Sequence, residues 1–316
     1  MILAALGGVG LVLLAVALYL SLNRAPDRPV SALQARWAPP PSRFVALEGM
    51  QVHLRDEGPR DDPAPLVLIH GTGSSLHAWD GWAERFAPTR RVVRFDRPGF
   101  GLTGPNPTGD YAMTYYAGFV ARLLDHLEIP RCVLVGSSSG GRVAWHVALA
   151  DPARLAGLVL VAPAGYPRST PFPLGFRIAQ SRLVAGLLAH VLPRGMIRRN
   201  LRRTYGDPAR VTPGLVARTY EITLRSGNRR ALGRTLIQAA ARDDSAEIAR
   251  IETPTLILWG ARDTVIPPAD AARFHAAIAG SQLVTFADLG HMPYEEDPAA
   301  SIVPVEAFLA TLPAGA

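Results

Sequence analysis

The chain of 316 residues contains no lysine and only one cysteine. A single cysteine excludes an intramolecular disulfide and leaves the redox compartment of the protein open. That residue, Cys132, lies inside an apolar run, where packing is its expected role. Because all 33 basic residues are arginine, a local excess of arginine partly reflects the composition of the whole chain.

The 26 acidic residues are fewer than the 33 arginines, so the formal net charge is +7. A basic chain can bind nucleic acid, but no known binding motif is present and aromatic residues do not interleave with the basic run. We therefore predict no nucleic-acid partner. We also predict neither a metal site nor a cofactor.

The amino-terminal segment, residues 1–22, carries no charged side chain and is almost wholly apolar. About twenty such residues can cross a bilayer core, so we predict a single-pass transmembrane anchor. A cleaved signal peptide is the alternative, but a basic n-region and a small-residue cleavage site are missing. Arginines follow the span, which favours a cytoplasmic catalytic domain. The Pro-rich residues 23–42 predict a stiff, extended linker.

The most informative motif is G-x-S-x-G at residues 136–140, where an apolar run that begins at Cys132 gives way to a helical pattern. Glycine is needed at Gly136 and Gly140 because a Cβ would clash in so sharp a turn. The turn lifts the Ser138 hydroxyl clear of the strand, above the amino terminus of the next helix. We therefore predict that Ser138 is a nucleophile.

A serine nucleophile needs a histidine base, and a carboxylate must orient that histidine. Two candidates follow apolar strand patterns downstream: Asp263 comes after residues 255–259, and His291 after residues 282–286. The carboxyl ends of strands in an open α/β sheet face the ligand, so the three side chains can converge. Other acidic residues compete with Asp263. The competitors are Asp270, Asp288, Glu295, Glu296 and Asp297. We interpret Asp270 as a charge in the first turn of a helix, and the three consecutive acidic residues 295–297 as the approach to the last helix.

An acyl-transfer site also needs donors for the oxyanion. The strand pattern at residues 66–69 ends in H-G-T-G, so the backbone N–H groups of Thr72 and Ser139 are the predicted donors, and the Thr72 hydroxyl is a third candidate. Gly71 is predicted to line the same substrate site. We interpret His70 as a brace for this loop.

Together these motifs resemble the bacterial α/β-hydrolases of the serine-nucleophile esterase and lipase branch. The resemblance rests on the elbow, H-G-T-G, D-R-P-G-F-G at residues 96–101, Gly260 to Asp263, and Gly290-His291. It implies a mostly parallel eight-stranded sheet flanked by helices, with Asp96 holding a turn. The predicted core is 43–164 with 251–316, and the predicted helical cap is 165–250. Periodicity predicts helices at residues 76–86, 114–127, 142–150, 176–192, 215–224, 269–278 and 299–309.

The resemblance implies hydrolysis of carboxylic esters, and the anchor suggests a hydrophobic, monoacylglycerol-like substrate at a bacterial inner membrane. Serines at 137 and 139 depart from the residues that many relatives carry there, which leaves the substrate open. C–C bond hydrolysis of dienoate-type diketones is the alternative, and a membrane-tethered binding module without activity is another. Arginines cluster in the cap and would suit anionic headgroups or a solvated helix face; they are Arg194, Arg198, Arg199, Arg202 and Arg203.

Overall fold

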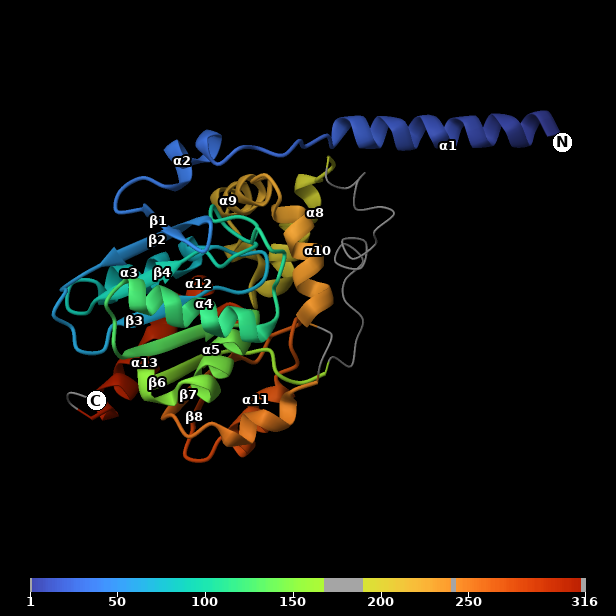
Figure 1. The fold of residues 1–316 in the computed structure, drawn as a ribbon. Coiled ribbons are helices and arrows are strands. Elements are labelled where there is room, and N and C mark those ends of the chain that lie inside the picture. The colour runs from blue at the N-terminus through green and yellow to red at the C-terminus, as the bar shows by residue number, and fades with distance from the viewer. Residues whose placement is uncertain (1, 168–189, 240–242, 314–316) are drawn as a thin grey trace.

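The computed structural model describes residues 2–167, 190–239 and 243–313. One sheet contains eight strands in the order β1-β2-β4-β3-β5-β6-β7-β8. Strand β2 pairs antiparallel with β1 and β4, and the other neighbouring pairs are parallel, as predicted (Figure 1). The strands are β1 (Arg43–Leu47), β2 (Met50–Glu57), β3 (Leu66–Ile69), β4 (Val92–Phe95), β5 (Cys132–Ser137), β6 (Leu155–Val161), β7 (Thr255–Gly260) and β8 (Gln282–Phe286).

Helices cover both faces of this sheet, so its central strands are apolar throughout instead of alternating. Every residue of β5 and β6 is buried, and Cys132 is part of that core, as expected. One core packs against α4 (Met113–His126), α5 (Ser139–Ala150) and α11 (Ala269–Ala277). The core on the other face packs against α3 (Asp80–Phe86) and α13 (Pro298–Thr311). Six of the seven helices predicted from periodicity are present, with ends shifted by a few residues and with residues 76–79 forming a 3-10 helix before α3. The seventh, predicted at residues 176–192, lies largely outside the described residues.

Between β6 and β7 the described residues form three helices, α8 (Arg194–Thr204), α9 (Pro213–Thr223) and α10 (Asn228–Ala239). Helices α8 and α9 pack around a small apolar cluster that includes Leu201 and Val216, whereas Ala231 of α10 belongs to one of the two cores of the sheet. Residues 168–189 and 240–242 of the predicted cap lie outside the described residues. The remaining short elements are η1 (Leu76–Trp79), η2 (Pro152–Arg154), η3 (Pro208–Arg210), η4 (Ser245–Arg250) and α12 (Pro293–Glu296).

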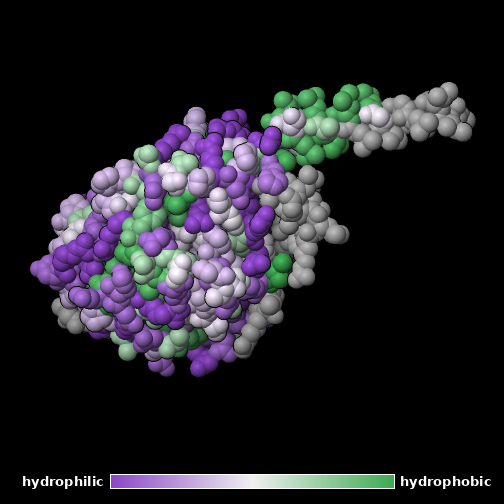
Figure 2. Space-filling model, turned by 45° about the horizontal axis from the view of Figure 1, so that its top comes forward, coloured by the Kyte–Doolittle hydropathy of each residue, from purple (hydrophilic) through white to green (hydrophobic). Residues whose placement is uncertain are grey.

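The amino-terminal helix α1 (Ile2–Leu22) projects from the body of the protein beside α8 (Figure 1). Its described side chains expose apolar surface, with Leu11 and Leu22 at least 70% exposed (Figure 2). Among the residues described in full, no helix combines the length and the apolarity that crossing a membrane requires. The predicted transmembrane anchor is therefore not confirmed.

The segment after α1 differs from the extended linker that its prolines predicted. It contains helix α2 (Ser31–Trp37), and its side chains contact the cap. Arg36 and Trp37 donate hydrogen bonds of 2.7 and 2.9 Å to Glu221 of α9. Asp27 pairs with Arg229 of α10 at 2.5 Å. Proline stiffens a chain but does not prevent polar and apolar side chains from docking, so this segment is a strap across the cap.

Candidate active site

The turn between β5 and α5 has the geometry that its sequence predicts. Ser138 lies between the two elements with φ of +54° and ψ of −121°, a strained backbone for a residue other than glycine. A Cβ on Gly136 would lie 2.4 Å from the Gly140 carbonyl oxygen, and a Cβ on Gly140 would lie 2.4 Å from the carbonyl oxygen of Ile69. Both glycines are therefore required by close backbone contacts.

A histidine and a carboxylate that follow two neighbouring strands contact each other. Nδ1 of His291 lies 2.7 Å from Oδ2 of Asp263, and both side chains are buried. The other carboxylate oxygen of Asp263 accepts the N–H groups of Val265 and Ile266 at 2.7 and 3.0 Å. These bonds fix the carboxylate, and the carboxylate orients the imidazole through Nδ1.

The predicted residues surround one cavity of about 1140 Å³. Ser138, His291, Gly71, Thr72 and Ser139 all line it, while the Asp263 side chain is buried behind the histidine. The structure therefore brings every predicted site residue to one place, although they come from four separate loops.

His70 braces the loop that carries Gly71 and Thr72. Its Nδ1 donates to the Gly71 carbonyl oxygen at 2.8 Å, and its Nε2 accepts the N–H of Arg97 at 3.1 Å. In a trans peptide the C=O and the following N–H point in opposite directions, so the Thr72 N–H points away from His70. A Cβ on Gly71 would lie 3.1 Å from the Ser138 Cβ, which places this loop directly beside Ser138.

Three of the acidic residues that compete with Asp263 have other partners. Asp270 lies in the first turn of α11 and pairs with Arg273, as interpreted from the sequence. Asp288 is exposed and pairs with Arg262. Asp297 caps α13 by accepting the N–H of Ala300.

Glu296 has a role that the sequence did not reveal. We interpreted it as a charge leading into the last helix, but it is only 6% exposed. Its Oε2 accepts the N–H of Gly290 at 2.8 Å and that of Gly206 at 2.9 Å, and its Oε1 accepts that of Asp207 at 2.8 Å. The loop that ends in His291 is therefore tied to the cap through one carboxylate.

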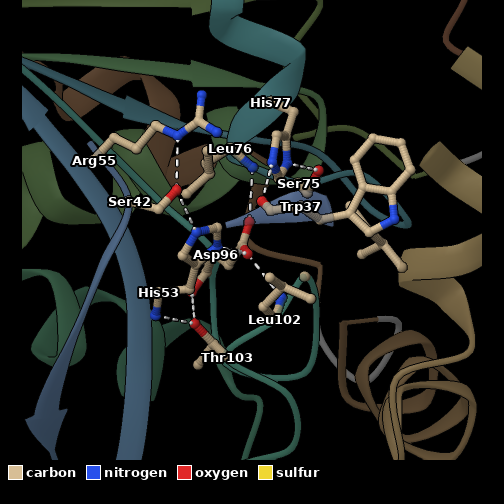
Figure 3. A network of polar contacts seen from close by, with 12 residues as sticks. Trp37, Ser42, His53, Arg55, Ser75, Leu76, His77, Asp96, Leu102 and Thr103 are labelled. Carbon is tan, nitrogen blue, oxygen red and sulfur yellow. Dashed lines mark hydrogen bonds and ion pairs between the residues drawn. The ribbon is translucent and has the colours of Figure 1, made fainter. Parts of the chain in front are cut away.

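A second buried polar network surrounds Asp96, which holds a turn as predicted (Figure 3). The carboxylate accepts the N–H groups of Leu76 and Leu102, both at 2.7 Å, and lies 2.6 Å from Nδ1 of His53. Burial alone would raise the pKa of Asp96, but His53, together with His70 and His77, more than offsets burial, so that pKa lies below its ordinary value. The nearby His77 donates from Nε2 to the Trp37 carbonyl oxygen at 2.7 Å, which joins α2 to this network.

Two histidines of this region make stability depend on pH. Burial, chiefly, lowers the pKa of His70 and of His77 to about 4, because the interior disfavours an imidazolium. An unfolded histidine titrates near 6.5, so the unfolded chain binds more protons between these values. The free energy of unfolding is therefore highest above about pH 6.5, where both histidines are neutral in either state, and it decreases as the pH falls towards 4. At pH 5 we expect each histidine to cost about 2 kcal/mol of unfolding free energy.

Urea unfolding followed at pH 7.5 and pH 5.0 measures this loss. The substitution His77→Gln should remove about half of the difference between the two pH values. His126→Gln serves as the control, because His126 is exposed and should leave the difference unchanged. An identical pH dependence in wild type and His77→Gln would show that His77 does not contribute to the difference.

Comparison with known proteins agrees with this geometry. The family model of the alpha/beta hydrolase fold matches residues 64–298. A 2-hydroxy-6-oxo-2,4-heptadienoate hydrolase of Pseudomonas putida is 30% identical, over 85% of this chain and 96% of the relative. A thermophilic esterase structure from Thermogutta terrifontis is 26% identical, with a TM-score of 0.69 over 85% of this chain and 97% of that one.

A crystal structure of a membrane phospholipase A, a bacterial virulence factor, is 24% identical and superposes with a TM-score of 0.73. The match covers 98% of both chains, and it shows a shared fold. The family model extends from β3 to the start of α13 and so includes all three residues of the candidate triad. The chain therefore belongs to the alpha/beta hydrolase fold family.

Proposed function

We propose that this protein is a serine hydrolase that cleaves carboxylic esters through an acyl-enzyme on Ser138. The observation that carries the proposal is the strained turn, which presents the Ser138 hydroxyl to the cavity lined by His291. A base oriented by a buried carboxylate and an adjacent nucleophile are the requirements for covalent acyl transfer.

The chemistry follows from these positions. Ser138 Oγ attacks the ester carbonyl while Nε2 of His291 takes its proton, since Nδ1 is held by Asp263 at 2.7 Å. The N–H groups of Thr72 and Ser139 stabilise the oxyanion. Collapse of the tetrahedral intermediate expels the alcohol, which receives the proton from His291. Water then attacks the acyl-enzyme by the same route and releases the acid.

We infer a hydrophobic, lipid-like ester, of the monoacylglycerol type, from the cavity wall. Many apolar side chains line it, and Tyr19 and Leu20 of α1 are among them. The apolar helix thus contributes to the wall of the cavity that contains the nucleophile. The lining includes Met113, Met196, Ile197, Leu236, Val265 and Ile266.

We also propose that α1 attaches the enzyme to a membrane, the bacterial inner membrane in the first instance. Its exposed apolar side chains support this assignment (Figure 2). Exposed arginines on α8 lie near the end of α1, where Leu192 donates to the Asn23 carbonyl oxygen at 3.1 Å, and such groups suit anionic headgroups. They are Arg198, Arg199, Arg202 and Arg203.

C–C bond hydrolysis remains a second candidate function because a relative with 30% identity acts on a dienoate. Arginines in the cavity lining, such as Arg142 and Arg203, would suit its carboxylate. A binding module without activity would not require an oriented base, and the Asp263–His291 contact gives that alternative no support.

One experiment separates these candidates. The full chain is assayed on p-nitrophenyl esters from acetate to palmitate and on 2-hydroxy-6-oxo-2,4-heptadienoate, and its flotation with phospholipid vesicles is measured alongside. We expect the largest kcat/KM on long-chain esters and co-flotation with the vesicles. A larger kcat/KM on the dienoate would replace the ester proposal, and failure to float would contradict membrane attachment alone.

A further inference from the structure

An arginine without a carboxylate partner is buried beside the candidate nucleophile. Arg97 follows β4 and is only 1% exposed. Its Nη2 donates to the Ser139 hydroxyl oxygen at 2.9 Å. Within residues 2–167, 190–239 and 243–313, Nε and Nη1 of this side chain have no hydrogen-bond partner, and no acidic side chain pairs with it.

The surroundings of Arg97 are aromatic. Its Cζ lies 5.0 Å from the ring centroid of Phe100 and 5.1 Å from that of Tyr116. Burial lowers the pKa of Arg97 from its usual value, but a guanidinium stays charged at neutral pH. The rings offset only part of the cost of burying a cation. Among the described residues, Ser139 is therefore the one group that accepts a hydrogen bond from this guanidinium.

The hydroxyl groups of Ser139 and Thr72 are hydrogen-bonded to each other, and the number of their hydrogens shows that one is not used in this bond. Their oxygens lie 2.8 Å apart, and both residues line the cavity. Two hydroxyls have two hydrogens, and the bond between them uses one. Arg97 occupies a lone pair of Ser139 and brings a hydrogen of its own. One hydroxyl hydrogen is therefore left over, whichever of the two oxygens carries it.

We propose that this remaining hydrogen is a third donor to the oxyanion and that Arg97 is the positioning residue that strengthens it through Ser139. The inference rests on the proposed function and adds to its two backbone donors. A hydroxyl that donates while it accepts from a cation is a stronger donor than a neutral hydroxyl. The charge on the oxyanion is thereby shared with a guanidinium that does not touch the substrate.

Direct binding of an anionic substrate by Arg97 is the competing explanation. It fits the geometry poorly, because Nη2 is occupied by Ser139 and the other two nitrogens are shielded from solvent. The two explanations differ in kinetics. A donor to the oxyanion acts on kcat, whereas a contact with the bound substrate acts on KM.

A double-mutant cycle on the full chain tests the proposal, with p-nitrophenyl butyrate as substrate. Arg97→Met should lower kcat roughly tenfold with KM unchanged, because charge-assisted hydrogen bonds are about twice as strong as neutral ones. In a Ser139→Ala background the same substitution should have no further effect. Arg97→Lys restores the charge and should regain most of the loss. The pair Thr72→Val and Ser139→Ala, which leaves Arg97 in place, should lose about 10²-fold in kcat.

Stability gives a separate readout. Because Arg97→Met removes an unpaired buried charge, its thermal midpoint should not fall. Equal losses of kcat from Arg97→Met in both backgrounds would overturn the proposal, and so would a change confined to KM. A loss of less than threefold in Thr72→Val/Ser139→Ala would overturn it even if Arg97→Met failed to fold.

Labelling by an alkyl fluorophosphonate distinguishes this inference from the proposed function. Ser138 Oγ forms a bond to phosphorus, the P–F bond breaks, fluoride leaves, and the hydroxyl proton passes to His291. The phosphonyl oxygen occupies the oxyanion position. The labelling rates of the same variants should therefore show the same pattern of losses as kcat does in the double-mutant cycle. A wild-type chain that is neither labelled nor active would defeat the proposed function. A labelled, active chain with additive losses would defeat only the role of Arg97.

Discussion

Substitution of Ser138 by alanine should lower kcat on p-nitrophenyl esters by about 10⁶-fold, as loss of the nucleophile does in other triads. The backbone at Ser138 is held by bonds from its N–H to Val161 and to its carbonyl from Ala164, both at 2.9 Å. Alanine keeps these bonds, so the fold should survive. The measurement is single-turnover and steady-state hydrolysis by both chains, with a thermal midpoint for each.

Ser137→Ala is the matched control, because that serine precedes the nucleophile and is buried at the end of β5. It should retain most of the activity. Hydrolysis within tenfold of wild type by purified Ser138→Ala would show that the acyl-enzyme route is wrong.

Asp263→Asn should lower kcat by about 10⁴-fold, the scale of the same change in other triads. The Oδ1 position accepts the N–H groups of Val265 and Ile266, so the amide oxygen of asparagine must stay there. Its NH₂ then faces Nδ1 of His291, which becomes an acceptor. The ring hydrogen moves to Nε2, the nitrogen that should receive the serine proton, and the histidine can no longer act as a base.

The control for this prediction is Asp288→Asn, since Asp288 is the acidic residue nearest in sequence to His291 and is exposed. It should leave kcat unchanged. Equal losses in the two variants would mean that negative charge near the loop, rather than the orientation of the ring, supports the activity.

The parts of the site that sequence reasoning located are those with a local signature. The turn at Ser138 requires glycines at fixed spacing, and both Asp263 and His291 follow directly after apolar strands. Their convergence follows from parallel strand order. Local spacing and strand order were therefore enough to predict the contact between Asp263 and His291.

The residues that sequence reasoning missed depend on distant partners. Glu296 lies in a helical context that suggests a surface charge, yet it binds Gly206 and Asp207 of the cap, far away in the sequence. Arg97 lies in a turn motif, and nothing local indicates that its guanidinium reaches Ser139. The prolines before α2 indicate stiffness but not the contact between Trp37 and Glu221.

The carboxylate of Glu296 joins the residues that follow α8 in the cap to the loop that carries His291, so the two must move together. His291 donates its N–H to the Thr204 carbonyl oxygen at 2.7 Å, so the end of α8 is held to the histidine loop by a direct bond as well. An outward swing of α8 must either break these bonds or displace the imidazole. We therefore expect substrate to enter without moving that end, and a hinge of the cap to lie elsewhere.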